Sequence, residues 1–182
     1  MKNVTFYDIE GLFSFENNVF GDDRGYFFES YNKRLFDEYA GQNVEFVQDN
    51  ISKSSKGVLR GLHFQAPPFA QAKLVRVIKG RALDVAVDIR KDSPTYGQHI
   101  AIELTEDNFL NFFVPRGFAH GFVALENNTV FSYKCDNFYN SESEDGILWN
   151  DESLSIQWGV NAPIISAKDQ VAKKFSLFTS PF

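Results

Sequence analysis

Residues 83–89 read Leu-Asp-Val-Ala-Val-Asp-Ile, and this short run decides the fold class. Its two sets of alternating side chains are Leu83, Val85, Val87 and Ile89 on one face, and Asp84, Ala86 and Asp88 on the other. Strict alternation over a few residues is typical of a β-strand, because successive side chains point to opposite faces. The run therefore predicts a strand in the middle of the chain.

Similar period-two runs lie on both sides of this strand, at 74–78, 99–104, 112–114, 121–125 and 129–135. Turn residues separate them at 79–80, 92–97, 115–117 and 126–128. The 20 Phe, 7 Tyr and 2 Trp residues also favour sheets over helices. Many short, evenly spaced strands predict an all-β sandwich or barrel. Helix is predicted only at 33–39, where Gly41 stops it, and at 167–175.

Length and composition describe an ordinary globular chain. Its 182 residues suit a single domain spanning 1–182. The net charge of −6 disfavours a nucleic-acid or anionic-membrane surface, and no apolar run is long enough to cross a bilayer. The one cysteine, Cys135, cannot form an intrachain disulfide and the first residues do not resemble a signal peptide, so we expect a cytoplasmic protein. Buried Cys135 would serve as a small apolar filler.

Several common chemistries have no motif here. The chain lacks a dinucleotide-binding glycine fingerprint, a Walker loop, a Gly-x-Ser-x-Gly elbow and a Cys-x-x-Cys pair. Its three histidines, His63, His99 and His120, are too far apart in sequence for a local metal-binding pair. We expect no metal, and we expect His99 to lie on a strand surface.

Functional residue types concentrate in two segments, 57–65 (GVLRGLHFQ) with the nearby 73–76 (KLVR), and 115–122 (PRGFAHGF). Together with 84–90 (DVAVDIR) and 146–151 (GILWND), these segments resemble the dTDP-4-dehydrorhamnose 3,5-epimerase family. The resemblance begins near 21–29 (GDDRGYFFE) and runs through Asp169. It implies a cupin-type β jelly roll with a few short helices, in agreement with the predicted strands. Many cupins hold a metal on a His-x-His pair, but Gln65 stands at the second position.

The resemblance further implies a homodimeric enzyme without a cofactor. It would invert C3 and C5 of dTDP-4-dehydro-6-deoxy-D-glucose and give dTDP-4-dehydro-L-rhamnose, the precursor of dTDP-L-rhamnose. Both carbons lie next to the C4 ketone, so loss of either proton gives an enolate that can be reprotonated on the opposite face. Such an enzyme needs a base, an acid and a cation for the developing O4 charge.

By the same resemblance His63 is the base, and Asp169 orients it and stabilises its imidazolium. Asp169 could instead complete a capping box with Ser166. Tyr133 matches the acid, although a buried Tyr is often only a packing residue. Lys73 is the cation, and alternation places it on an apolar face with Val75 and Val77.

The remaining matches are substrate contacts. Arg60 and Lys168 would hold the diphosphate, His120 would contact the substrate, and Tyr139 would stack on thymine. Glu144 also matches a ligand contact, but Ser141 and Glu144 form a rival capping box. The family's nucleotide contacts, some from the partner subunit, correspond to Arg24, Glu29, Gln48 and Asn50. Because Arg60 and His63 are three residues apart, they share a face only if the strand carries a bulge or Arg60 lies at the barrel mouth.

Two other functions remain open at this point. Mono-epimerases of related dTDP-deoxysugar pathways share this fold and chemistry and invert one centre only. A non-catalytic jelly-roll module that binds a nucleotide sugar is the second alternative. The joint presence of His63, Asp169, Lys73 and Tyr133 argues against it, because binding alone requires neither a base nor an acid.

Overall fold

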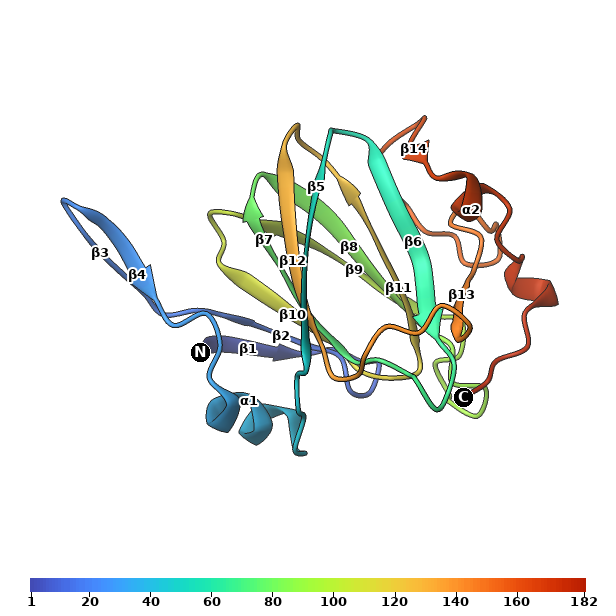
Figure 1. Cartoon of the computed structure of the whole chain (residues 1–182), viewed down its shortest axis with the longest axis horizontal. Helices are drawn as coiled ribbons and strands as arrows, with labels where there is room; N and C mark the ends of the chain where they lie inside the picture. The colour runs from blue at the N-terminus through green and yellow to red at the C-terminus, as the bar shows by residue number, and fades with distance from the viewer.

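The computed structural model describes residues 1–182, and two β-sheets facing each other form its body (Figure 1). The first sheet has the order β1 (Lys2–Phe6), β2 (Phe13–Glu16), β10 (Leu110–Val114), β7 (Lys73–Lys79), β12 (Thr129–Cys135) and β5 (Gln48–Ser54). The second has the order β13 (Glu144–Gly146), β6 (Val58–Gln65), β11 (Phe118–Ala124), β8 (Arg81–Asp88) and β9 (His99–Thr105), with β14 (Ile164–Ile165) pairing parallel to β6. This is a jelly-roll barrel, so the predicted all-β class is confirmed.

All the strands predicted from alternation are present. The run at 129–135 is β12 with identical bounds, and the run at 83–89 lies within and just beyond β8. Alternation did not reveal β6, the strand that carries Arg60 and His63. Its sequence does not alternate cleanly because a bulge interrupts the strand, as the pairing of β6 with β11 shows.

The apolar stripe of β8 faces away from the barrel interior. Val85, Val87 and Ile89 pack beneath the C-terminal part of the chain, in a cluster that also contains Trp158. Ala82 and Ala86 belong to the core between the two sheets. Both faces of β8 are therefore buried, and the C-terminal segment acts as a third layer outside the second sheet.

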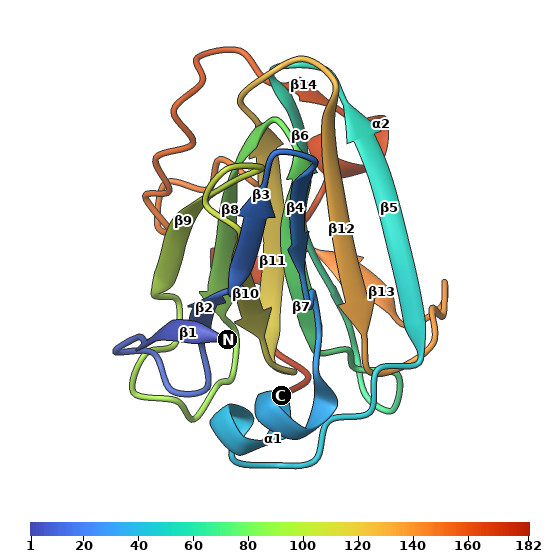
Figure 2. The same cartoon turned by 90° about the vertical axis from the view of Figure 1, so that its left-hand side faces the viewer.

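The helices are few and short. Helix α1 (Lys33–Ala40) lies at one end of the barrel (Figure 2). The Asn32 side chain caps its start and Gly41, with φ of 65°, ends it as predicted. The helix expected over 167–175 is wrong in extent, because only α2 (Ala167–Gln170) and a 3-10 turn, η1 (Phe175–Leu177), form. None of these helices has the length and apolar character needed to cross a membrane.

The chain leaves the helix after α2 because it pairs with a neighbouring segment. Lys173 forms a parallel β-bridge with Ile147, and the Leu148 N–H donates to the Lys173 carbonyl at 2.8 Å. These backbone bonds replace those that a longer helix would make. They also fix α2 against β6, which places Asp169 beside the barrel.

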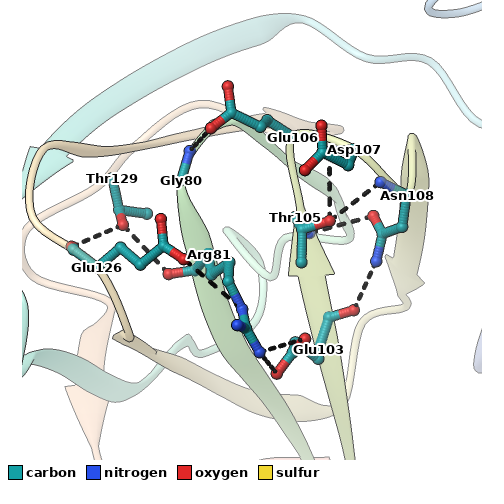
Figure 3. A network of polar contacts seen from close by, with 9 residues as sticks. All are labelled: Gly80, Arg81, Glu103, Thr105, Glu106, Asp107, Asn108, Glu126 and Thr129. Carbon is teal, nitrogen blue, oxygen red and sulfur yellow. Dashed lines mark hydrogen bonds and ion pairs between the residues drawn. The ribbon is translucent and has the colours of Figure 1, made fainter.

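A polar network fastens the end of the barrel where β7 turns into β8 (Figure 3). Arg81 makes a two-pronged ion pair with Glu103 at 2.8 and 2.9 Å, and the Gly80 N–H donates to Glu106 at 3.0 Å. The Thr129 hydroxyl donates to the Arg81 carbonyl at 3.1 Å. The network ties β8, β9 and β12 together at their ends.

One hairpin, β3 (Val19–Asp22) with β4 (Gly25–Phe28), extends away from the barrel (Figure 1). Phe20, Tyr26 and Phe27 on this hairpin are each more than 60% exposed. Large apolar side chains are rarely gathered on the surface of a protein unless they meet a partner.

Candidate active site

The bulge in β6 brings Arg60 and His63 to the same cavity. His63 lies opposite His120 on β11, while Arg60 lies opposite Phe122, so three residues of β6 span two of β11. Gly61 has φ of 119°, and a side chain there would meet the backbone of His120 and Gly121 at 2.6 Å. Only glycine fits this close approach. The bulge, one of the two arrangements that would bring Arg60 and His63 to the same face, is therefore present.

A cavity of about 490 Å³ opens between the two sheets, and a second of about 270 Å³ adjoins it. His63, Lys73, Tyr133 and Glu144 line both. The larger cavity is also lined by Arg60, His120, Lys168 and Asp169, and the smaller by Gln48, Asn50 and Tyr139. The fold thus gathers these predicted site residues, which are scattered along more than a hundred residues of sequence, at one place.

His63 and Asp169 form a close pair. The His63 Nε2 atom lies 2.6 Å from Asp169 Oδ1, and the carboxylate is buried. Burial raises the pKa of Asp169, but the hydrogen bond and charge of His63, the Gly61 N–H and the Ser166 side chain outweigh it and lower the pKa overall. Because a carboxylate only accepts hydrogen bonds, Nε2 carries the proton and Nδ1 keeps its lone pair.

Only one half of the capping box between Ser166 and Asp169 is present. Ser166 caps α2, and its side chain accepts a hydrogen bond from the Asp169 backbone N–H at 3.1 Å. The Asp169 carboxylate meanwhile turns away to His63 and the Gly61 N–H. The cap fixes the backbone of Asp169 and so aims its carboxylate.

Lys73 and Tyr133 lie next to each other inside the barrel, with the Lys73 Nζ atom 6.0 Å from the centre of the tyrosine ring. Burial lowers the pKa of the Lys73 amine, against the opposing influence of Cys135, Asp84 and Glu144. Burial and Cys135 raise the pKa of the Tyr133 phenol. The phenol is therefore held protonated, as an acid must be before it acts.

A second histidine–aspartate pair lies beside the first, and sequence reasoning missed its acid. His120 Nε2 lies 2.9 and 3.0 Å from the two oxygens of Asp84, and both residues are buried. The signal was available, because Asp84 belongs to the 84–90 segment and sits on a strand flanked by apolar residues. A charged group in such a place requires a partner.

The smaller cavity is rich in amides. The Gln48 side chain donates to Asn50 at 3.1 Å and accepts from the Tyr139 N–H at 3.0 Å. The Tyr139 ring is 56% exposed, and its hydroxyl donates to Glu144 at 2.9 Å. The exposed ring can stack on a flat heterocycle, and the neighbouring amides can form hydrogen bonds with the polar groups along the edge of that heterocycle.

Glu144 lies in a strand, so the alternative capping box with Ser141 is wrong. Its carboxylate pairs with Lys168 at 2.5 Å as well as with Tyr139. Burial raises the pKa of Glu144, but these two partners outweigh it and lower the pKa overall. Glu144 therefore connects Lys168, which lines the larger cavity, to Tyr139, which lines the smaller one.

Arg60 lies at the rim, where its Nε atom donates to the Ser54 hydroxyl at 3.3 Å. Its guanidinium NH₂ groups make no hydrogen bond within the protein, so they can bind an anion bidentately. Lys168 on α2 lines the same cavity. Two cations from different elements thus face one opening.

Gln65 and Cys135 have structural partners. The Gln65 amide donates to the Phe69 and Phe138 carbonyls and accepts from the Asn140 N–H at 2.7 Å. Cys135 is buried, its pKa is raised chiefly by burial, and it contacts the Asn50 amide. No group of three or more His, Cys, Asp or Glu side chains is arranged so that it could hold a metal ion.

Two predicted contacts lie outside both cavities. Arg24 is at the tip of the projecting hairpin, fully exposed and paired with Asp22 at 2.6 Å. Glu29 follows β4 and is also exposed. Within one chain, neither residue belongs to the site.

A histidine held by a buried carboxylate on one sheet faces a tyrosine and a buried lysine on the other sheet, and groups of these types can carry out acid–base chemistry in a jelly-roll barrel. The sequence model of the dTDP-4-dehydrorhamnose 3,5-epimerase family matches residues 7–176. The enzyme of that name from Shigella flexneri is 51% identical over 173 residues, which cover 95% of this chain and 96% of the relative. The chain belongs to the dTDP-4-dehydrorhamnose 3,5-epimerase family.

Solved structures agree with this assignment. The dTDP-4-dehydrorhamnose 3,5-epimerase from Elizabethkingia anophelis is 53% identical, with a TM-score of 0.91 and 96% coverage of both chains. A dTDP-6-deoxy-D-glucose-3,5-epimerase from Legionella pneumophila, solved with dTDP-4-keto-L-rhamnose, is 43% identical with a TM-score of 0.94. The matched regions cover 97% of this chain and 94% of the Legionella chain.

Proposed function

We propose that this protein inverts C3 and C5 of dTDP-4-dehydro-6-deoxy-D-glucose, giving dTDP-4-dehydro-L-rhamnose in dTDP-L-rhamnose biosynthesis. The observation that carries the proposal is the convergence of His63, Lys73, Tyr133 and Asp169 on one cavity. At each centre a C–H proton leaves to a base and a proton returns to the opposite face. The oxidation level does not change, so the reaction as written requires no redox cofactor.

His63 is the base. Its Nδ1 atom takes the proton from C3 or C5, while the Nε2–H remains hydrogen-bonded to Asp169. The imidazolium that results lies 2.6 Å from a buried carboxylate, which stabilises its charge. Asp169 therefore acts through His63 as a positioning residue.

Lys73 and Tyr133 complete the reaction. When the proton leaves, negative charge develops on O4, and the buried Lys73 amine, protonated in the complex, donates a hydrogen bond to it. Tyr133 then delivers a proton to the carbon from the face opposite His63. The apolar surroundings that raise the Tyr133 pKa keep this proton in place until the enolate forms.

The remaining residues bind the nucleotide. Arg60 and Lys168 hold the diphosphate, Tyr139 stacks on thymine, and His120, oriented by Asp84, contacts the sugar. Gln48, Asn50 and Glu144 lie along the smaller cavity and bind the nucleoside end. The chain is proposed to act as one domain, 1–182, with neither a metal nor another cofactor.

The projecting hairpin supports a homodimer. Its exposed Phe20, Tyr26 and Phe27 would be covered by a second copy of the chain. Arg24 and Glu29, which reach neither cavity of their own barrel, would then be delivered to the site of the partner. The single cysteine, buried and free, suits the reducing cytoplasm, where we place the protein.

A matched pair of measurements separates this proposal from its rivals. Purified protein is incubated with dTDP-4-dehydro-6-deoxy-D-glucose and the product is identified by NMR, with dTDP affinity measured in parallel. We expect His63→Ala to lose turnover and keep its affinity. Equal turnover by the variant and the parent would refute the mechanism. Inversion at only one carbon by the parent would indicate a mono-epimerase. Binding without turnover by the parent would indicate a binding module.

A further inference from the structure

Strand β5 lines one wall of the larger cavity, and one of its inward side chains has no partner. Gln48, Asn50 and Ser54 on its inner face hydrogen-bond to Tyr139, Cys135 and Arg60, respectively. Ser52 lies between Asn50 and Ser54 on the same face, and its hydroxyl is buried without any hydrogen bond. A buried hydroxyl without a partner is rare in a native protein and calls for an explanation.

The other polar side chains that line the larger cavity explain why the Ser52 hydroxyl has no partner. Among the polar side chains that line it, only Lys73, Tyr133 and Ser52 make neither a hydrogen bond nor an ion pair with the rest of the protein. Lys73 and Tyr133 are free because their partner is the substrate. Ser52 also lacks a partner and lines the same space, and of the three groups only its hydroxyl has almost no exposed surface, which points to a ligand atom that reaches it inside the cavity.

The pairing of β5 with β12 indicates which part of the ligand Ser52 meets. Asn50 lies opposite Tyr133, and Ser52 lies opposite Phe131, two residues further along the strand and roughly 7 Å away. Ser54, the next inward residue, holds the Arg60 guanidinium. Ser52 therefore stands between the proposed acid and the proposed diphosphate-binding arginine.

We propose that Ser52 is a further substrate-binding residue, whose hydroxyl donates a hydrogen bond to a diphosphate oxygen of the bound nucleotide sugar, beside Arg60. A phosphate oxygen only accepts hydrogen bonds, and the neighbouring Phe131 ring offers the hydroxyl no competing acceptor. The inference rests on the proposed function, because it takes a nucleoside diphosphate sugar as the ligand.

The test compares Ser52→Ala with Ser132→Ala by calorimetry, using dTDP and dTDP-glucose as separate probes. Ser132 lies on β12 opposite Ile51 and lines the outer face of the sheet, so its variant is a matched control. We expect Ser52→Ala to bind both probes about tenfold more weakly than the parent, and Ser132→Ala to bind as the parent does. The ligand-free Ser52→Ala protein should melt no lower than the parent, because its unpaired hydroxyl contributes nothing to the empty fold.

Unchanged affinity of Ser52→Ala for both probes would overturn the proposal. Weakening confined to dTDP-glucose would overturn it too, since the contact would then be to the sugar. A lower melting temperature with unchanged affinity would assign Ser52 a structural role. If the parent epimerises its substrate while Ser52→Ala binds normally, only this inference fails, whereas a parent that binds neither probe would refute the proposed function as well.

Discussion

Asp169→Asn tests the histidine–aspartate pair with the smallest possible change. In the parent, Asp169 Oδ1 contacts His63 Nε2 at 2.6 Å and Oδ2 accepts the Gly61 N–H at 3.4 Å. In the variant, the amide oxygen must take the Gly61 N–H, so the NH₂ group faces His63. Two donors cannot share one hydrogen bond, and the ring therefore moves its proton to Nδ1. The Nδ1 lone pair that we propose removes the substrate proton is then lost from the cavity.

The size of the effect follows from the contact. A hydrogen bond to a charged group contributes about 1.5–3 kcal/mol, which corresponds to roughly 10- to 150-fold in rate. The wrong tautomer adds to this loss, and the comparable change in a serine protease triad costs about 10⁴-fold. We expect kcat to fall about 10²- to 10⁴-fold, with the affinity for dTDP unchanged.

The assay is steady-state turnover of the 4-keto sugar nucleotide, with dTDP affinity measured by calorimetry. Asp151→Asn is the matched control, because Asp151 is a buried carboxylate bonded to Ser153 and the Phe175 N–H and it lines neither cavity. That variant should keep the parent's kcat. A kcat for Asp169→Asn within about threefold of the parent, in a folded protein, would show that the carboxylate does not hold the base.

Three further predictions concern the acid, the bulge and a buried carboxylate. Tyr133→Phe removes the proposed proton donor, so we expect kcat to fall about 10²- to 10⁴-fold with dTDP affinity retained, and a near-normal kcat would contradict the assignment. Gly61→Ala places a Cβ at 2.6 Å from the backbone of residues 120 and 121, so the melting temperature and turnover should both fall. Gly57→Ala is the control for a positive φ without a steric clash, because φ is 84° there and nothing lies within 4 Å of the added Cβ. Burial raises the pKa of Asp88, but bonds from Arg90, Ser93 and Thr95 outweigh it and lower the pKa from 3.8 to about 2. The stability this provides, about 2 kcal/mol, is present above pH 3.8 and is lost as the pH falls through about 2, so Asp88→Asn should remove that part of the pH dependence in urea unfolding curves.

Alternation predicted the strands well because it reports a local property. The run at 129–135 became β12 without a change of bounds, and Gly41 ended α1 as expected. Alternation does not say which face looks into the barrel. In β8 the more apolar face turned outward beneath the C-terminal segment, because that segment supplies Trp158 and other apolar side chains to cover it.

The resemblance named most of the residues that line the two cavities, but it also named Arg24 and Glu29, which lie outside them. The geometry of the cavities depended on features that sequence motifs do not carry. The odd spacing of Arg60 and His63 called for a bulge or for Arg60 at the barrel mouth, and the position of the bulge at Gly61 depends on the close approach of Gly121 on another strand. Asp84 was missed because its role depends on a histidine that lies 36 residues away in sequence. Ser52 was missed because what distinguishes it is a buried hydroxyl without a hydrogen-bond partner, and a sequence motif does not show the absence of a partner.

The helix predicted at 167–175 and the capping box at Ser141 and Glu144 failed for one physical reason. Both predictions used local helix signals, and in both places pairing to a distant segment was stronger. Lys173 bridges to Ile147, and Glu144 pairs in β13 with Gln65 on β6. Backbone pairing with a distant segment, an isolated bridge in the first case and a sheet in the second, replaced the local helical bonds.

Deuterium incorporation tests the central claim most directly. The protein is incubated with dTDP-4-dehydro-6-deoxy-D-glucose in deuterated water, and the label at C3 and C5 is followed by NMR and mass spectrometry. Proton abstraction and return at both centres predicts deuterium at both carbons, with the label lost in His63→Ala. Absence of label in the parent would contradict the acid–base chemistry assigned to this cavity, and label at one carbon alone would contradict the double inversion.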